Sequence, residues 1–266
     1  MIIAADASGP DSSALRAFAI LELIAGAETP PSLEDLTRGS GLPKPTVYRI
    51  LRLLIRGGLA QRDLAVKRYF VGTRTSALSL QVQTRSPFRA QRHAALSRLV
   101  DEIGETCNFT MLDGAEVVYL DRVETPEKVR LHMDVGSRVP LHCTASGKLF
   151  LAHLPPGQVR RFLGAGPLER YTEPTVTSIE ALERELKKIR ANGVSSDCGE
   201  FLPGSVCLAV PVADARGRVC AAIAVHGPAP RMTLTRGYEF LPAMRRAAAV
   251  IAATLVPGTP AERHAA

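Results

Sequence analysis

One stretch of the chain concentrates side chains that can bind a nucleic acid. Between Arg38 and Arg74 there are nine Lys and Arg residues and one acid, Asp63, so this segment carries 9 − 1 = +8. The net charge of the whole 266-residue chain is +7, and the remainder is therefore nearly neutral. A compact basic patch is the electrostatic signature of a polyanion partner. The segment predicts contact with double-stranded DNA.

The arginines in this stretch fall on one face of a predicted helix. Tyr48, Arg49, Arg52 and Arg56 are spaced at i, i+1, i+4 and i+8, opposite an apolar stripe. In a helix-turn-helix the N-terminus of this helix enters the major groove, so base contacts are expected from its first residues. Phosphate contacts are expected further along. The expected base-contacting residues are Lys44, Thr46, Tyr48 and Arg49, and the expected phosphate-contacting residues are Arg52 and Arg56.

The elements around this helix predict a winged helix-turn-helix over residues 12–72. Helices are expected from Ser12 or Ser13, from Ser32, which resembles a capping box with Asp35, and from Lys44. Two short strands at 59–62 and 68–71 would form a hairpin whose basic residues, Lys67 and Arg68, touch the DNA backbone or minor groove.

Residues 73–86 are predicted to form a linker helix with apolar positions Leu78, Leu80 and Val82. The dipeptide Ser86-Pro87 marks the expected domain boundary, because the residue before a proline disfavours helix. We expect the apolar positions to pack between protomers or onto the wing.

Residues 87–257 predict a second, α+β domain with a mainly antiparallel sheet, because its strands and helices are segregated rather than alternating. The expected strands are 106–112, 116–122, 129–135, 206–213 and 219–226, and Asp113-Gly114 is a strong hairpin turn. The expected helices are those ending at Gly104 and those at 145–153, 158–163, 179–192 and 238–256.

The cysteines are five in number and include no C-x-x-C pair, so a disulfide framework is not expected. The chain shows no signal peptide and no apolar run of membrane length, which predicts a cytoplasmic protein without a membrane partner. No cofactor motif is present. Two alternatives remain: a Cys/His hydrolase-like enzyme with a thiol nucleophile, and a zinc-sensing regulator. A ligand-binding module without a DNA function is a third, which the basic segment disfavours.

Several separate segments together resemble the IclR-type family of bacterial transcription regulators, over roughly residues 13–256. The resemblance implies a dimeric DNA-binding domain, a C-terminal GAF-like domain that binds a small effector, and dimers that pair into tetramers. One departure is Pro45, where the family often has Ser. The segments are Ser32-Leu33-x-Asp35-Leu36, Gly41-Leu42-Pro43-Lys44-x-Thr46, Gly57-Gly58-Leu59, Arg68-Tyr69-x-Val71-Gly72, Leu112-Asp113-Gly114, Val118–Glu124, Val139–Lys148 and Gly227–Thr233.

The resemblance also implies an effector pocket whose walls include Ala145, Asp197, Cys207 and His226. The helix after Ala145 offers free N–H groups, including that of Ser146, which suit a carboxylate. Where the family commonly shows Ser-x-Ser-Gly-Pro, this chain has Ala224-Val225-His226-Gly227-Pro228, so the pocket chemistry is expected to differ from that of relatives that bind small keto acids. The expected apolar walls are Met111, Leu131 and Leu141.

These observations predict a ligand-responsive transcription regulator that binds a pseudo-palindromic operator as a dimer or dimer of dimers. A small organic acid, of aromatic type or otherwise, is the expected effector. No catalytic residue and no resident metal are expected in this interpretation.

Overall fold

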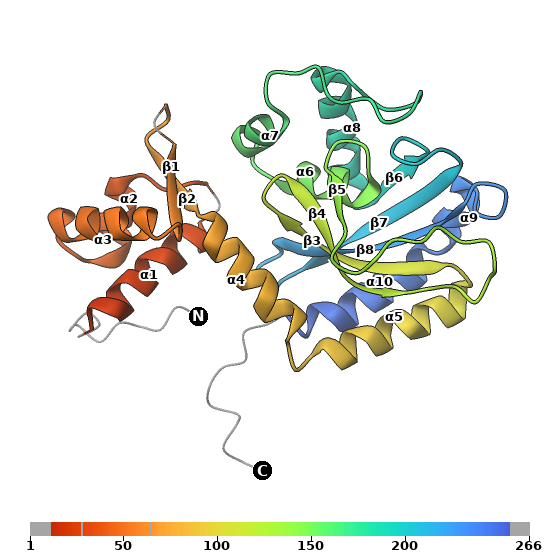
Figure 1. The fold of residues 1–266 in the computed structure, drawn as a ribbon, viewed down its shortest axis with the longest axis horizontal. Helices are drawn as coiled ribbons and strands as arrows, with labels where there is room; N and C mark the ends of the chain where they lie inside the picture. The colour runs from red at the N-terminus through yellow and green to blue at the C-terminus, as the bar shows by residue number, and fades with distance from the viewer. Residues whose placement is uncertain (1–11, 28, 64, 256–266) are drawn as a thin grey trace, which may run out of the picture. The chain divides into compact units, whose positions relative to one another are not determined.

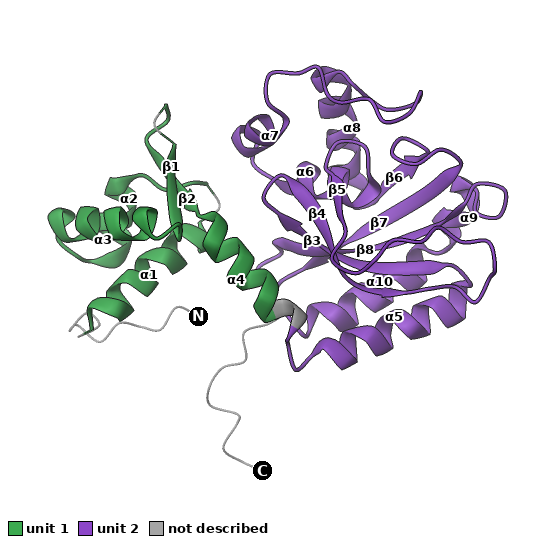
Figure 2. Ribbon diagram, in the orientation of Figure 1, with its two compact units in different colours: residues 1–82 green, residues 83–266 purple. Residues whose placement is uncertain are grey.

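The computed structural model of the chain describes residues 12–27, 29–63 and 65–255. It forms two compact units, Met1–Val82 and Gln83–Ala266, which Figure 2 shows in different colours. The division falls within the predicted linker, residues 73–86. The predicted end of the second domain at residue 257 lies outside the described residues.

Unit 1 has the predicted order of three helices, a hairpin and a further helix (Figure 1). Strands β1 and β2 pair antiparallel, with Ala60 opposite Val71. The arrangement is a winged helix-turn-helix followed by a helix that crosses the division between the units. The elements are α1 (Ser13–Gly26), α2 (Leu33–Ser40), α3 (Lys44–Arg56), β1 (Ala60–Asp63), β2 (Arg68–Val71) and α4 (Thr73–Thr84).

Local sequence explains where the helices of unit 1 begin and end. The Ser32 hydroxyl accepts from Asp35 N, while the Asp35 carboxylate accepts from Ser32 N, which completes the predicted capping box at α2. Gly41 ends α2 with φ 67, a left-handed conformation that glycine adopts without strain. Pro45 stands in the first turn of α3, where its missing N–H leaves no hydrogen bond unmade.

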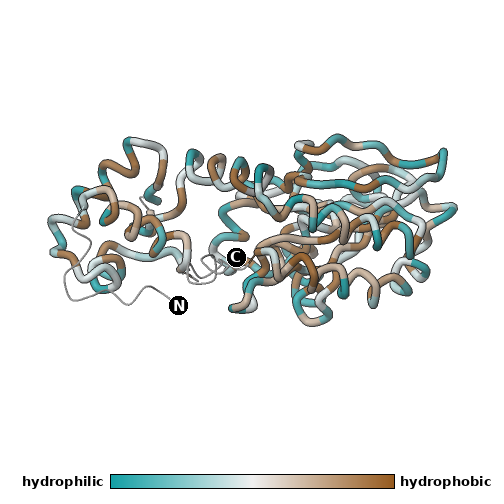
Figure 3. The backbone as a smooth tube through the Cα atoms, turned by 90° about the horizontal axis from the view of Figure 1, so that it is seen from below, coloured by the Kyte–Doolittle hydropathy of each residue, from teal (hydrophilic) through white to brown (hydrophobic). Residues whose placement is uncertain are grey.

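Unit 2 is built on a six-stranded sheet in the order β5-β4-β3-β8-β7-β6, in which every neighbouring pair is antiparallel. This confirms the predicted α+β class. Figure 3 shows the apolar colour gathered toward the inside of the unit, as expected for a sheet covered on both faces. The strands are β3 (Thr106–Asp113), β4 (Glu116–Val123), β5 (Arg138–Pro140), β6 (Ser195–Cys198), β7 (Ser205–Ala213) and β8 (Val219–Pro228).

Helices cover both faces of this sheet (Figure 1). α5 (Arg89–Ile103) and α10 (Leu241–Ala252) lie side by side on one face, and α6 (Ala145–His153) packs on the other, against α8 (Ile179–Asn192). The remaining helices are α7 (Pro156–Leu163) and α9 (Leu234–Glu239). Helix α6 packs against β7 and β8, which places its N-terminus over the middle of the sheet.

Two predicted elements are wrong in detail, and two strands, β5 and β6, are absent from the prediction. Residues 129–135 alternate apolar and polar side chains but form no strand, because side chains take their backbone carbonyls: Arg231 donates to Val129 O and Arg122 to Leu131 O. The predicted helix 238–256 is instead two helices, α9 and α10, which meet at Phe240, and Pro242 lies in the first turn of α10. Strand β6 was not predicted, since Ser-Ser-Asp-Cys carries little apolar signal.

Candidate functional site

The basic row on α3 is exposed, as the sequence predicts. Lys44, Tyr48, Arg49, Arg52 and Arg56 lie in solvent, and Thr46 is half-buried. The row is positioned by the apolar face of the same helix, which packs against α1 and α2. The buried residues of that face are Val47, Ile50, Leu51 and Leu54.

The two basic residues of the wing differ in their surroundings. Lys67 is exposed near the hairpin turn, with φ 53. Arg68 begins β2, and its Nη1 donates to Asp35 Oδ2 at 3.0 Å and to Pro30 O at 3.3 Å. Arg68 therefore fastens the wing to the start of α2, a contact that the sequence did not reveal.

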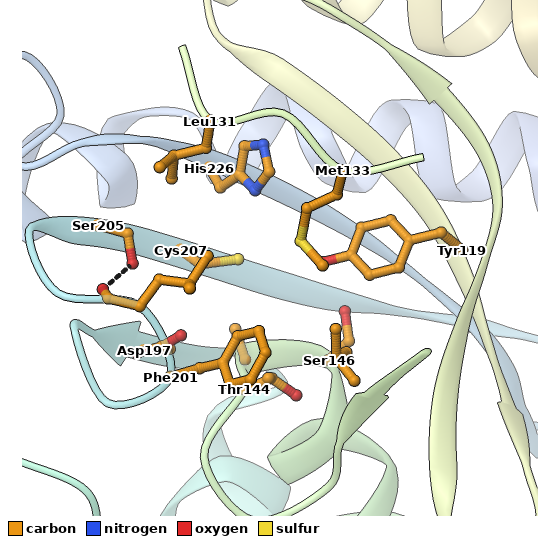
Figure 4. A pocket seen from close by; sticks show the side chains of 13 residues that line it. Tyr119, Leu131, Met133, Thr144, Ser146, Asp197, Phe201, Ser205, Cys207 and His226 are labelled. Atoms are coloured by element: carbon orange, nitrogen blue, oxygen red, sulfur yellow. Dashed lines mark hydrogen bonds between the residues drawn. The ribbon is translucent and has the colours of Figure 1, made fainter. Parts of the chain in front are cut away.

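A small cavity in unit 2 lies between the N-terminus of α6 and the sheet (Figure 4). Its volume is about 20 Å³, which is enough for about one water molecule. Six of the predicted effector residues line it. These are Leu131, Ala145, Ser146, Asp197, Cys207 and His226.

Two of the predicted apolar walls do not line this cavity. The Thr110 hydroxyl contacts Ser146 Oγ at 3.1 Å, so Met111, the next residue of β3, is directed to the opposite face of the sheet. Leu141 packs in the core beside α6 instead. Tyr119 belongs to a segment that carried the family resemblance, yet it was not predicted as a wall. The lining residues that were missed are Tyr119, Met133, Val139, Thr144, Phe201, Leu202 and Ser205.

The N-terminus of α6 presents hydrogen-bond donors to the cavity. Thr144 caps the helix, and its hydroxyl accepts from Gly147 N at 3.1 Å. In the described part of the chain, the N–H groups of Ala145 and Ser146 have no acceptor. Unpaired N–H groups at a helix start carry a partial positive charge that favours an anion.

His226 faces these donors from strand β8, and its side chain appears in Figure 4 at the far side of the cavity. Only 6% of the residue is exposed, and its Nε2 has no hydrogen-bond partner among the described residues. Burial, with a smaller contribution from the Arg122 charge, lowers the pKa of His226 to about 3. The imidazole is therefore neutral at physiological pH and keeps a polar atom available for a ligand.

Asp197 is 5% exposed and begins a turn that shapes another wall. Its Oδ1 accepts from Glu200 N at 2.7 Å, so part of its hydrogen-bonding capacity holds the backbone. Burial raises the pKa of Asp197 to about 6. The carboxylate is mainly ionised at neutral pH and can accept from a ligand hydroxyl.

Behind this wall lies an ion cluster that the sequence did not reveal. Lys148, completely buried, donates from Nζ to Glu185 at 2.6 Å and to Glu200 at 2.5 Å. Burial raises the pKa of Glu200 to about 7. The cluster joins α6, α8 and the turn after β6, and thereby fixes the positions of Asp197 and Phe201.

The site has little capacity for the two alternative chemistries. Burial raises the pKa of the Cys207 thiol well above its ordinary value, so the thiol is protonated and a weak nucleophile. Within the described ranges, no three His, Cys, Asp or Glu side chains converge in an arrangement that could hold a metal ion.

Comparison with known proteins identifies the class. Residues 13–64 match the family described as IclR helix-turn-helix domain, and residues 80–253 match Bacterial transcriptional regulator IclR C-terminal. The chain belongs to the IclR family of bacterial transcription regulators, as its sequence motifs implied. The relatives found are transcription regulators and not enzymes.

Individual relatives align along nearly the whole chain. A Cupriavidus necator protein named "Probable transcriptional regulator SauR" is 46% identical over 90% of this chain and 94% of its own length. The Transcriptional repressor IclR of Escherichia coli is 30% identical over 90% of this chain and 88% of its own.

One similar solved structure is that of an IclR homolog from Microbacterium hydrocarbonoxydans complexed with 4-hydroxybenzoate. It is 26% identical, with a TM-score of 0.57 over 92% of this chain and 99% of that one.

Among the described residues, no helix has both the length and the apolar character needed to span a membrane.

Proposed function

We propose that this regulator binds a pseudo-palindromic operator of roughly 12–20 base pairs, because a dimer reads two half-sites about one helical turn apart. Support comes from the exposed basic row of α3, which follows a helix-turn-helix turn and precedes a basic wing. In this proposal Arg49 contacts base edges and Arg56 contacts phosphate.

The effector in this proposal is a small organic acid bound at the N-terminus of α6. The observation that carries it is the unpartnered Nε2 of His226, buried opposite the free N–H groups of Ala145 and Ser146. A carboxylate would accept from the helix, and a second polar group would meet His226 or Asp197. The homolog complexed with 4-hydroxybenzoate supports this ligand class.

A cavity of about 20 Å³ is smaller than any organic acid, so a wall must move when the ligand enters. Strands β4, β7 and β8 are held by ladder hydrogen bonds on both sides. Leu131 and Met133 instead belong to the irregular segment between β4 and β5. We expect this segment to be displaced.

DNA binding is tested by selecting sites from a random duplex pool and measuring affinity by fluorescence anisotropy. Arg49→Ala should cost about 1–3 kcal/mol and relax specificity at one position, whereas Arg56→Ala should weaken all sequences similarly and reduce the salt slope. Lys187→Ala, an exposed lysine of α8 in unit 2, is the matched control. Unchanged affinity in both α3 variants would rule out α3 as the helix that contacts DNA.

Effector binding is tested by thermal shift with a panel of carboxylates that includes 4-hydroxybenzoate. A ligand at a hundredfold excess over Kd stabilises the folded protein by about 2.7 kcal/mol. His226→Ala and Asp197→Ala should reduce the shift, while Asp101→Asn, an exposed acid of α5, should not. Equal responses from all variants would place the ligand elsewhere.

A further inference from the structure

A second and larger cleft opens on unit 2, at the edge of the sheet formed by β5. Its volume is about 480 Å³, within the range of small-molecule sites. Leu141, Leu163, Leu168 and Phe162 contribute apolar walls, and three further ring side chains complete them, those of His142, Tyr171 and Phe201. Phe201 is the one residue that lines both this cleft and the cavity described above.

The three rings form a connected cluster. The Tyr171 and Phe201 centroids are 5.2 Å apart in an edge-on arrangement, and those of His142 and Tyr171 are 5.9 Å apart. Tyr171 is 40% exposed, so part of its ring remains open to a ligand. The face of an aromatic ring is electron-rich and attracts a cation within about 6 Å of its centroid.

The charges of the cleft are predominantly negative. Glu116 and Glu169 line it, and the Tyr171 hydroxyl donates to Glu169 Oε2 at 2.9 Å. The lining cation, Arg138, donates from Nη1 to Glu116 and from Nη2 to Asp113, so both terminal nitrogens are already engaged by carboxylates. The charged lining residues Glu116, Glu169 and Arg138 sum to −1, and Asp113, which contacts Arg138, adds a further negative charge next to the cleft, so an anion is disfavoured.

We propose that this cleft binds a small organic cation, an ammonium or guanidinium group that carries an apolar substituent. The cation would lie over the Tyr171 ring and pair with the Glu169 carboxylate. The substituent would pack on Leu163 and Leu168. This site is separate from the effector pocket and does not depend on the ligand assigned there.

The test uses the full chain and benzyltrimethylammonium as the probe, titrated by isothermal calorimetry. Tyr171→Leu and Glu169→Gln should each weaken binding about two- to fivefold, because cation–π and ion-pair contacts at a partly exposed site are of this size. Tyr171→Phe keeps the ring and should lose less. Glu173→Gln, an exposed acid on the same loop that does not line the cleft, is the matched control.

Two further measurements locate the probe. His226→Ala should leave its affinity within about twofold, and saturating benzoate should not displace it. The proposal is overturned if the probe shows no saturable binding, if Glu169→Gln binds as the parent does, or if His226→Ala abolishes binding. If no carboxylate binds but the cationic probe does, the proposed effector pocket is wrong and the proposal for this cleft stands.

Discussion

Burial determines the chemistry of His226 more than any single neighbour does. Its imidazole lies at the effector cavity with Nε2 unpartnered, and desolvation keeps it neutral. A neutral imidazole can donate or accept according to its tautomer, so the residue suits ligands that carry either a hydroxyl or a keto oxygen. A serine at this position would offer a smaller group and leave more space.

We predict that His226 makes stability depend on pH. Its folded pKa of about 3 lies below the ordinary value of 6.5, so the unfolded chain takes up the proton first as pH falls. Stability contributed by this group is therefore present above pH 6.5 and is lost progressively toward pH 3. At pH 5 the loss is about 2 kcal/mol.

The comparison that isolates this effect is His226→Gln. Urea unfolding is measured at pH 8, 6.5 and 5. From pH 8 to pH 5, the free energy of unfolding of the variant should rise by about 2 kcal/mol relative to that of the parent. A difference that stays constant across the range would mean that the folded imidazole titrates normally, and that the cavity is open to water.

Helix α6 is the element that brings the donors to the sheet, and one glycine permits its approach. A Cβ added at Gly147 would lie 2.3 Å from Leu141 O and 2.5 Å from Leu141 Cα. Both atoms are backbone, so relief would require moving the helix.

Gly147→Ala is therefore expected to destabilise the folded protein by about 3 kcal/mol, at the upper end of overpacking costs. Gly157→Ala in α7 is the matched control, because no atom lies within 4 Å of the added Cβ, and it should be neutral or stabilising by up to about 1 kcal/mol. The change in stability is measured from the midpoints of denaturant unfolding, provided that the m-values are unchanged. Equal midpoints for the two variants would show that α6 can shift freely.

The wing yields a prediction that separates its two basic residues. Lys67 is exposed, whereas Arg68 donates hydrogen bonds to Asp35 and to Pro30 O. Lys67→Ala should therefore weaken DNA binding without changing the melting temperature, while Arg68→Ala should lower both. Anisotropy and thermal unfolding on the same preparations test this. Identical melting temperatures would show that the Arg68 contact contributes nothing to stability.

Elements with strong periodicity were predictable from the sequence, and elements held by side chains were not. The apolar stripe of α3 and the capping box of α2 each fix a local structure, and both are as predicted. Residues 129–135 have a strand pattern, but the side chains of Arg122, on the preceding strand, and of Arg231, distant in the sequence, compete for the backbone carbonyls. Such a competition leaves no periodic signal.

The effector cavity was predictable in part for the same reason. Ala145, Asp197, Cys207 and His226 came from motif resemblance and do lie together. Met111 was placed on the wrong face, because a bulge in β3 at Phe109/Thr110 and the true strand limits could not be read from sequence. The buried ion pairs of Lys148 could not be predicted, since its carboxylate partners are 37 and 52 residues away.

At the scale of the whole molecule, charge and pocket belong to different units. The basic segment lies in unit 1 and the effector cavity in unit 2, with α4 crossing the division between them. An effector changes DNA occupancy only if its affinity differs between the DNA-competent and incompetent states. We expect the coupling to use the chain connection through α4 and an assembly of several copies.

We predict that such an assembly exists, as a dimer or tetramer. A pseudo-palindrome needs two winged modules related by symmetry. Leu78 and Val82 of α4 are 54% and 58% exposed in a single chain, and their i, i+4 spacing gives a continuous apolar strip. Burying both against a second copy would remove this surface from water.

Light scattering at micromolar concentration should therefore report at least twice the chain mass. The double variant Leu78→Glu/Val82→Glu should lower that mass, because carboxylates on both sides of the contact repel and lose solvation. It should also weaken binding to the full operator far more than to a half-site, since each module reads its half-site alone. Ser79→Glu, which adds a charge at another exposed position of α4, is the matched control. A monomeric parent protein would contradict the prediction of an assembly that reads a palindrome. If the double variant is still an oligomer, the interface does not involve Leu78 and Val82 of α4.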